Sequence, residues 1–308
     1  MSIYKEYYLS HNISDALKAL SNAPGPTRII AGGTDLLLDL KQGRHLPVHT
    51  LVDVTEIQEL SALEVRGNQV FVGASVPLNR IVTNPLMYNH LTALVEACGL
   101  IGGPQVRITA TLGGNVAHAL PAADGTIALL ALGAQVEIAS LEGHRKIPLE
   151  ELFLAPGKSI LDPQRDLLVG FYLPLRKPGQ SSAFKRVMRP QGVALPILNM
   201  AVWLDRQDNT ILDVRLSVGP AGPKPFRARK TESALKGQIF SNKAIDIAKQ
   251  ALLEEARFRT SPSRASAEYR KSLAGNLLED VLRTGWVRSN QSGDETDFMI
   301  SSIQAPGG

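Results

Sequence analysis

The stretch TATLGGNVAHALPAADGT, residues 109–126, combines two adjacent glycines with an asparagine, a histidine, a proline and an aspartate, and it has no helical or strand period. A second stretch, IIAGGTDLLLDL at residues 29–40, interrupts an apolar run with another glycine pair. Paired glycines permit positive φ and close backbone approach. Successive N–H groups in such a loop can also point into one concavity that binds phosphate oxygens. Two such loops suit a pyrophosphate; the alternative is that the glycines only form tight turns.

Polar side chains accompany both glycine pairs. Thr34 follows the first pair, and Thr111 and Asn115 flank the second. Neither stretch contains a lysine or the Walker spacing, which argues against nucleoside triphosphate hydrolysis, and neither has the G-x-G-x-x-G spacing of a dinucleotide fold. Asp124 is then a candidate acceptor for ribose or other hydroxyls of the same ligand.

The composition describes a globular protein with one large or two modest domains, since 44% of its 308 residues are hydrophobic and 20% are charged. The net charge of +4 does not by itself indicate nucleic acid, and the arginines near residues 254–270 alternate with glutamates, as on a solvated helix face. No apolar run reaches the roughly 18–20 residues of a membrane span. The first twenty residues do not read as a secretion signal.

Cys98 is the single cysteine of the chain. This excludes a disulfide framework, and it excludes an iron–sulfur cluster or a cysteine-rich zinc site made by this chain alone. The apolar helical pattern around Cys98 favours a small buried hydrophobe over a reactive thiol. We expect a cytoplasmic location, no metal site and no catalytic acid–base pair on this chain.

The pattern of apolar residues predicts α and β elements in an irregular order. A Pro/Gly/Ser-rich segment at residues 176–182 is the candidate domain boundary. The elements expected before it are helices at 14–20, 86–100 and 125–132, a strand–turn–helix at 28–41, a hairpin at 63–76 and strands after Gly133 and before Pro174. Those expected after it are three strands and two helical regions, at 226–256 and 263–284.

Five segments, in order, resemble the FAD-binding medium subunit of molybdenum hydroxylases, the family that includes carbon monoxide dehydrogenase and xanthine dehydrogenase. They are AGGTDLL, GPQVRITATLGGNVAHALPAADGTIALLALGA, SAFKRV, RLSVGPAGPKPFRA and SRASAEYRKSLA. The resemblance spans roughly residues 1–285. Any one motif would be weak evidence, but five in the expected order are highly specific.

The resemblance implies an α+β fold in two domains. Residues 1–176 would form a two-lobed FAD-binding domain of the vanillyl-alcohol-oxidase (PCMH) type, with lobes at about 1–56 and 57–176. Residues 183–286 would form a small C-terminal α+β domain with a three-stranded sheet and helices. The polar, Gly-rich composition after the resemblance ends predicts a flexible tail at residues 287–308.

The resemblance also implies where FAD binds, with the pyrophosphate between the two glycine segments. Asp124 would contact the sugar region, Leu168 and Lys185 would lie beside the cofactor, and Ile101 and Gly102 would lie near the isoalloxazine. Carried over residue by residue, the full set of cofactor-binding residues is Ala31, Gly32, Gly33, Thr34, Asp35, Ile101, Gly102, Thr111, Gly113, Gly114, Asn115, Asp124, Leu168 and Lys185.

Some positions keep two interpretations. Lys185 could tune the flavin by its charge or could be a strand-end surface lysine. His118 could lie near the cofactor or could be a solvated or capping histidine. Two features depart from the family: MRPQGVALP, after the FKR strand, lacks the aromatic residue that shields the flavin in some relatives, and Cys98 alone cannot support the extra cluster found in others.

The function implied by the resemblance is electron transfer. FAD would take electrons from iron–sulfur clusters on a small partner subunit, fed by a molybdopterin large subunit, and pass them to NAD+, a quinone or O2. The complex would be a dimer of heterotrimers, and the molybdenum subunit would select the organic substrate. The alternatives are a stand-alone FAD-dependent oxidoreductase with the same architecture and, from another class, a nucleotide-binding regulatory module.

Overall fold

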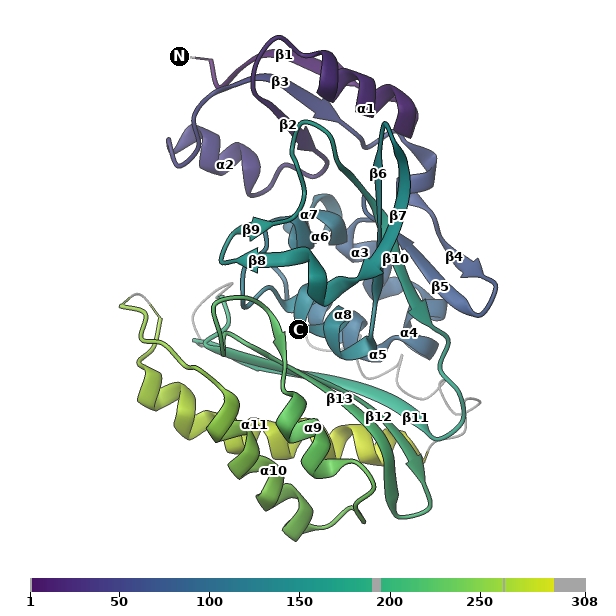
Figure 1. Ribbon diagram of the computed structural model, residues 1–308, viewed down its shortest axis with the longest axis vertical. Coiled ribbons are helices and arrows are strands. Elements are labelled where there is room, and N and C mark those ends of the chain that lie inside the picture. Colours follow the sequence, from purple (N-terminus) through teal and green to yellow (C-terminus); the bar gives the residue numbers. More distant parts are fainter. Residues whose placement is uncertain (1, 190–194, 263, 291–308) are drawn as a thin grey trace, which may run out of the picture.

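The chain forms three parts that follow one another along its long axis (Figure 1). The computed structural model describes residues 2–189, 195–262 and 264–290. A small parallel sheet with two helices lies at the N-terminal end, a larger antiparallel sheet with short helices occupies the middle, and a second antiparallel sheet backed by helices lies at the other end.

The first lobe is a three-stranded parallel sheet with strand order β1-β3-β2. Its elements are β1 (Tyr4–Leu9), α1 (Ile13–Asn22), β2 (Thr27–Ile30), α2 (Leu36–Lys41) and β3 (Val48–Asp53). Asn12 caps α1, because its side chain accepts a hydrogen bond from the N–H of Asp15 at 2.8 Å. The sheet places the first glycine segment directly after β2.

The second lobe is built on a five-stranded antiparallel sheet with strand order β4-β5-β10-β6-β7. The strands are β4 (Leu63–Arg66), β5 (Gln69–Gly73), β6 (Gln135–Ser140), β7 (Gly143–Pro148) and β10 (Leu167–Pro174), with a small pair β8 (Phe153–Ala155) and β9 (Lys158–Ser159). Short helical elements fill the connections: η1 (Gln58–Ser61), α3 (Leu78–Thr83), α4 (Pro85–His90), α5 (Thr92–Gly99), α6 (Pro104–Thr109), α7 (Leu112–Ala117), α8 (Asp124–Leu132) and η2 (Leu149–Leu152).

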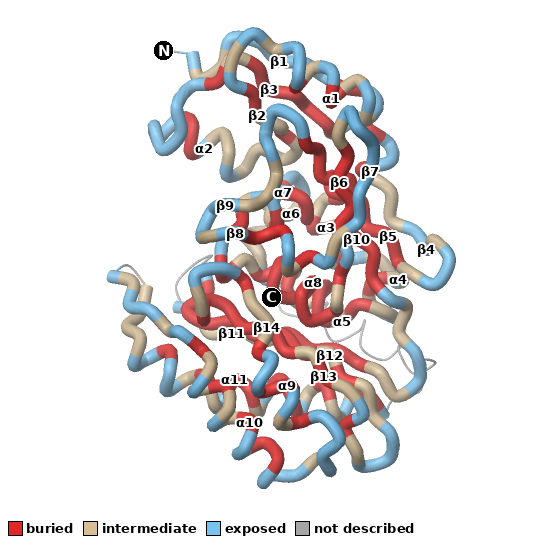
Figure 2. The backbone as a smooth tube through the Cα atoms, in the orientation of Figure 1, coloured by how far each residue is buried: buried red, intermediate tan, exposed pale blue. Residues whose placement is uncertain are grey.

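Helix α8 is the centre of this lobe. All nine of its residues are buried, which matches a sequence that is apolar all round rather than on one stripe. The helix ends at Gly133, whose φ of +72° gives the left-handed C-terminal cap that glycine adopts without strain. Figure 2 shows the buried backbone concentrated along α8 and the sheet strands beside it.

The C-terminal domain is a four-stranded antiparallel sheet backed by helices. Its elements are β11 (Gln180–Val187), β12 (Leu198–Gln207), β13 (Thr210–Gly219), β14 (Phe226–Arg227), α9 (Arg229–Leu235), α10 (Asn242–Glu255) and α11 (Ala267–Arg288). Side chains alternate along β12: Ala201 belongs to the core of the second lobe, and Val202 packs in the core with α10 and α11. One face of the sheet therefore closes onto the second lobe.

The structure confirms the α+β class, the hairpin before residue 76, the end of the helix at Gly133 and the strand ending at Pro174. It differs elsewhere. Residues 86–100 form two helices, because Leu91 leaves the helical conformation with φ −133° and ψ 45°. Residues 226–256 hold a short strand and two helices, and β14 adds a fourth strand to the sheet. The strand β1 was not predicted. Most of the expected tail, residues 291–308, lies outside the residues that the structure describes.

Candidate cofactor site

The first glycine segment is the turn between β2 and α2. Gly33 has a φ of +66°, so the turn needs a residue that enters the left-handed region freely. A Cβ on Gly32 would lie 2.1 Å from the carbonyl oxygen of Thr109, closer than any real contact. The backbone of residues 31–35 therefore lies directly against the chain that leads into the second glycine segment.

The second glycine segment is helical, which corrects the expectation of an irregular loop. Thr111 caps α7, because its Oγ1 accepts a hydrogen bond from the N–H of Gly114 at 3.1 Å. The N–H of Gly113 donates to the carbonyl oxygen of Ala74 at 2.9 Å, and a Cβ on Gly113 would lie 2.5 Å from that oxygen. Positive φ occurs at Gly33 and not at Gly32, Gly113 or Gly114. Close approach, rather than left-handed conformation, explains glycine at Gly32 and Gly113.

Side chains join the two segments. His118 follows α7, and its Nδ1 lies 3.5 Å from Oδ2 of Asp35 in the first segment. Its Nε2 lies 4.0 Å from Oδ2 of Asp39 on α2, and Asp39 also pairs with Arg44 at 2.9 Å. The interaction with Asp35 raises the pKa of His118, although partial burial opposes that shift. The structure thus places the first glycine segment against Thr109, Ala110 and His118, which flank the second glycine segment on both sides.

Asp124 begins α8 and lies in a buried polar junction with the C-terminal domain. Its Oδ2 accepts a hydrogen bond from Nη1 of Arg186 at 2.6 Å, and its Oδ1 accepts one from Nδ2 of Asn199 at 2.6 Å. The side chains of Asp124 and Arg186 are 4% and 5% exposed. Burial raises the pKa of Asp124, and the Arg186 guanidinium and the Asn199 amide oppose that rise. Asn115 connects to this junction, because its Oδ1 accepts from the N–H of Thr126 at 3.2 Å.

Three buried polar atoms in this region have no hydrogen-bond partner among residues 2–189, 195–262 and 264–290. They are Nε of Arg186, Oδ1 of Asn199 and Oγ1 of Thr126. Buried polar groups are nearly always satisfied, so these donors and acceptors suit the hydroxyls of a ligand or bound water. The close-packed glycine backbones and these unpaired polar atoms fit a cofactor with a pyrophosphate and a polyhydroxy chain.

Sequence reasoning did not select Arg186 or Asn199. Arg186 follows Lys185 in the SAFKRV motif, so that motif could have pointed to it. Asn199, which pairs with Arg186 across the sheet, could be identified only from the fold. Lys185 itself is half-buried on β11, opposite Met200 of β12.

The remaining predicted residues lie in other surroundings. Ile101 and Gly102 follow α5, where Nη1 of Arg107 donates to the carbonyl oxygen of Gly102 at 2.7 Å. Gly102 has a φ of +58°. Leu168 is buried in the core of the second lobe, and its backbone pairs with Ile138. Ile101 packs, partly buried, against the core of the second lobe.

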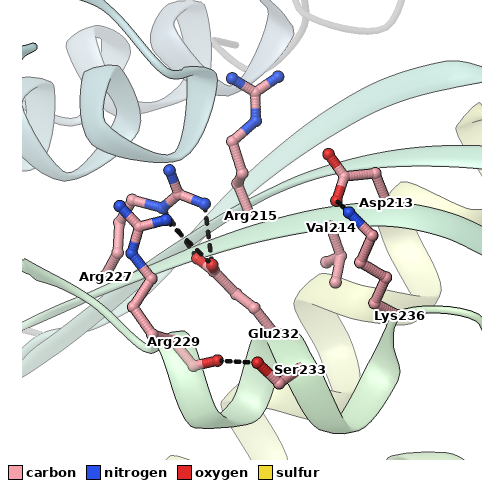
Figure 3. A pocket seen from close by; sticks show the side chains of 8 residues that line it. All are labelled: Asp213, Val214, Arg215, Arg227, Arg229, Glu232, Ser233 and Lys236. Carbon is pink, nitrogen blue, oxygen red and sulfur yellow. Dashed lines mark hydrogen bonds and ion pairs between the residues drawn. The ribbon is translucent and has the colours of Figure 1, made fainter.

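A separate hollow of about 580 Å³ lies on the C-terminal domain, between β13 and α9 (Figure 3). Arg227 and Glu232 form a bidentate ion pair across it, and Nζ of Lys236 lies 2.8 Å from Oδ1 of Asp213. Arg215 turns away from these pairs and donates to the carbonyl oxygen of Leu132 at the end of α8. None of the predicted cofactor residues lines this hollow.

Two further searches cover only the described ranges 2–189, 195–262 and 264–290. Within them, no set of three or more His, Cys, Asp or Glu side chains is arranged to hold a metal ion. Within the same ranges, no helix has the length and apolar character needed to cross a membrane.

Comparison with known proteins finds similar sequences over most of the chain. Residues 3–176 match the FAD binding domain in molybdopterin dehydrogenase, and residues 182–284 match the CO dehydrogenase flavoprotein C-terminal domain. The nicotine 6-hydroxylase medium subunit of Paenarthrobacter nicotinovorans is 32% identical, over 88% of this chain and 93% of its own. The carbon monoxide dehydrogenase medium chain of Hydrogenophaga pseudoflava is 27% identical, over 92% of this chain and 97% of its own.

A solved structure is also similar to this chain. A chain of carbon monoxide dehydrogenase from Hydrogenophaga pseudoflava, in a form that lacks the Mo-pyranopterin moiety of the molybdenum cofactor, superposes with a TM-score of 0.88 at 26% identity. The match covers 92% of this chain and 98% of that chain. The fold and site together define an FAD-binding oxidoreductase subunit of the PCMH type. The chain belongs to the family of FAD-binding subunits of molybdenum hydroxylases.

Proposed function

We propose that this chain transfers electrons within a molybdenum hydroxylase, from iron–sulfur clusters on a partner subunit to an external acceptor such as NAD+, a quinone or O2. FAD, when bound, supplies the redox chemistry, and the protein supplies binding, orientation and electrostatics. The observation that carries the proposal is the direct contact of the two glycine segments, at Gly32 and Thr109, beside the buried polar junction around Asp124.

The cofactor would lie where these features meet. The backbones of Ala31–Asp35 and Thr111–Asn115 would enclose the pyrophosphate. The N–H groups of Gly113 and Gly114 already bond to Ala74 and Thr111, so the glycines would contribute close backbone packing around the phosphates rather than free N–H donors from the second segment. The junction of Asp124, Arg186 and Asn199 would receive hydroxyls of the sugar region. Ile101, Gly102, Leu168 and Lys185 complete the proposed contacts near the flavin ring.

The partners follow from what this chain can hold. Its one cysteine, Cys98, is fully buried, and burial raises the pKa of its thiol, so the chain cannot build an iron–sulfur cluster. The clusters would therefore lie on a partner chain. The family resemblance implies a small iron–sulfur subunit and a large molybdopterin subunit, in a dimer of heterotrimers. A single cysteine also favours a reducing cytoplasmic compartment.

A steric variant tests the cofactor site. Gly32→Val adds side-chain atoms where a Cβ alone would lie 2.1 Å from the Thr109 carbonyl, so it must force the two glycine segments apart. We expect purified Gly32→Val to lose FAD, measured by visible absorption and by mass identification of the flavin released on denaturation. Gly275→Ala is the matched control, because its Cβ would meet only the flexible side chain of Lys249 at 3.6 Å. A folded Gly32→Val chain with full FAD occupancy would contradict the proposed site.

Purification of the native complex tests the electron-transfer role. Affinity capture of this chain from its host should bring along a cluster-containing and a molybdenum-containing chain, detected by metal analysis and mass spectrometry. The rates at which NAD+, a quinone and O2 reoxidise the reduced complex would then identify the acceptor. An isolated chain that turned over an organic substrate fully without partners would overturn the proposal in favour of a stand-alone oxidoreductase.

A further inference from the structure

One histidine bridges the two lobes of the FAD-binding half. His118 follows α7 in the second lobe, and its two ring nitrogens face two carboxylates of the first lobe: Nδ1 lies 3.5 Å from Asp35, and Nε2 lies 4.0 Å from Asp39. Asp35 belongs to the first glycine segment, and His118 follows the second closely in sequence. The contact therefore spans the place where the two segments meet.

The net charge around this contact depends on whether His118 is protonated. Asp39 also pairs with Arg44 at 2.9 Å, and the ring of His45 lies 3.9 Å from Asp39. With Asp35 and Asp39 ionised, Arg44 cancels one negative charge. A neutral His118, with His45 also neutral, leaves one negative charge beside the proposed pyrophosphate site. A protonated His118 cancels it, and it attracts both carboxylates at once.

We infer that His118 is a positioning residue for the cofactor: its protonated ring holds the first glycine segment against the second and removes a negative charge beside the phosphates, so that FAD binds more tightly when His118 is charged. The inference rests on the proposed placement of FAD between the glycine segments. It assigns no redox or proton-transfer step to His118. Its consequence is a cofactor affinity that falls as the pH rises.

The direction of this pH dependence follows from the pairing. Asp35 raises the pKa of His118 above its ordinary 6.5, and His118 lowers the pKa of Asp35 below its ordinary 3.8. Both groups are therefore charged at pH values between the lowered pKa of Asp35 and the raised pKa of His118. The ion pair is lost as the pH rises through the raised pKa of His118. His118 and Asp35 are partly exposed, at 36% and 66% of their side chains, so solvent screens the pair. We expect a change in FAD affinity of about threefold to fivefold.

Two substitutions separate the charge from the shape of His118. The apo chain is titrated with FAD, followed by flavin fluorescence, from about pH 5.5 to about pH 8.5. The wild-type Kd should rise about threefold to fivefold over that range. His118→Gln should show the weaker, high-pH affinity throughout, and His118→Arg should keep the tighter affinity throughout. His144→Gln, whose ring pairs with Glu137 at 2.8 Å elsewhere in the lobe, should behave like wild type.

A second readout does not involve FAD. The pKa of His118, followed by NMR of histidine ring signals and assigned by the signal missing in His118→Gln, should lie above 6.5 and should fall in Asp35→Asn. A Kd of His118→Gln that keeps the wild-type pH dependence would overturn the inference, as would a His118 pKa that Asp35→Asn leaves unchanged. FAD retention by Gly32→Val would instead locate the failure in the proposed cofactor site, since the NMR result stands without it.

Discussion

Arg186→Met should destabilise the protein strongly, because it leaves the carboxylate of Asp124 buried without its cation. The two groups are hydrogen-bonded at 2.6 Å, and both side chains are at least 95% buried, at 4% and 5% exposure. Breaking a buried pair by removing one partner costs about 3–5 kcal/mol, since an uncompensated charge remains. Asn199 still donates one hydrogen bond to Asp124, so we expect the low end, about 3 kcal/mol near pH 8.

The loss should depend on pH in a defined direction. Burial already raises the pKa of Asp124 in the folded chain, and removing Arg186 raises it further, because the guanidinium is a group that opposes the rise. Between the ordinary value of 3.8 and the raised value, the folded variant binds a proton that the unfolded chain does not. Its stability should therefore increase as the pH falls, with a limiting slope of about 1.4 kcal/mol per pH unit.

Urea unfolding of the apo chain at several pH values measures both effects. Trp203 and Trp286 lie in the C-terminal domain, so their fluorescence reports the half that carries Arg186, and far-ultraviolet circular dichroism reports the whole chain. Arg283→Met is the matched control, because Arg283 pairs with Glu279 at 2.9 Å while 46% exposed, and it should cost less than about 1 kcal/mol. A loss below about 1 kcal/mol for Arg186→Met, or a loss unchanged between pH 5 and pH 8, would refute the reasoning.

Two more predictions concern other parts of the chain. Cys98 is fully buried, and burial raises the pKa of its thiol. A thiol reagent at pH 8 should therefore leave the folded protein unmodified and should label one thiol per chain in urea. Rapid labelling of the folded chain would contradict the packing around α5. Arg227→Met should lower the free energy of unfolding by about 2 kcal/mol, because it removes the bidentate ion pair between Arg227 and Glu232. The Kd for FAD should stay unchanged. Weaker FAD binding in a folded variant would show that the C-terminal hollow and the cofactor site are coupled.

Several elements were readable from the sequence because local chemistry decides them. Gly133 ends α8 in a left-handed cap, and glycine is the residue that adopts that conformation without strain. The strand β12 is one of the three strands expected after the domain boundary, and both of its faces are covered. Leu91 shows the limit of periodicity: an apolar face that continues through residues 86–100 does not show that the backbone breaks between α4 and α5.

The helix α7 could not be predicted from its residues, since two consecutive glycines each disfavour a helix interior by about 1 kcal/mol. The tertiary structure overrides that preference. Thr111 caps the first turn, and Gly113 donates to the carbonyl oxygen of Ala74 on a neighbouring part of the chain. That contact admits no Cβ, so glycine is required there by packing although it is unfavourable for the helix. A glycine pair in a sequence therefore does not by itself distinguish positive φ from close approach.

Asp124 shows what the sequence leaves open in the site itself. The prediction placed its carboxylate against hydroxyls of the cofactor, and the fold places it against Arg186 and Asn199, which follow it by 62 and 75 positions. No local pattern encodes that pairing. The two roles are compatible, because an ionised carboxylate has about four acceptor sites and these two partners use one on each oxygen. A hydroxyl that reached Asp124 would then bind to an acceptor already fixed in place by Arg186, so this cation would orient the acceptor as well as balance its charge.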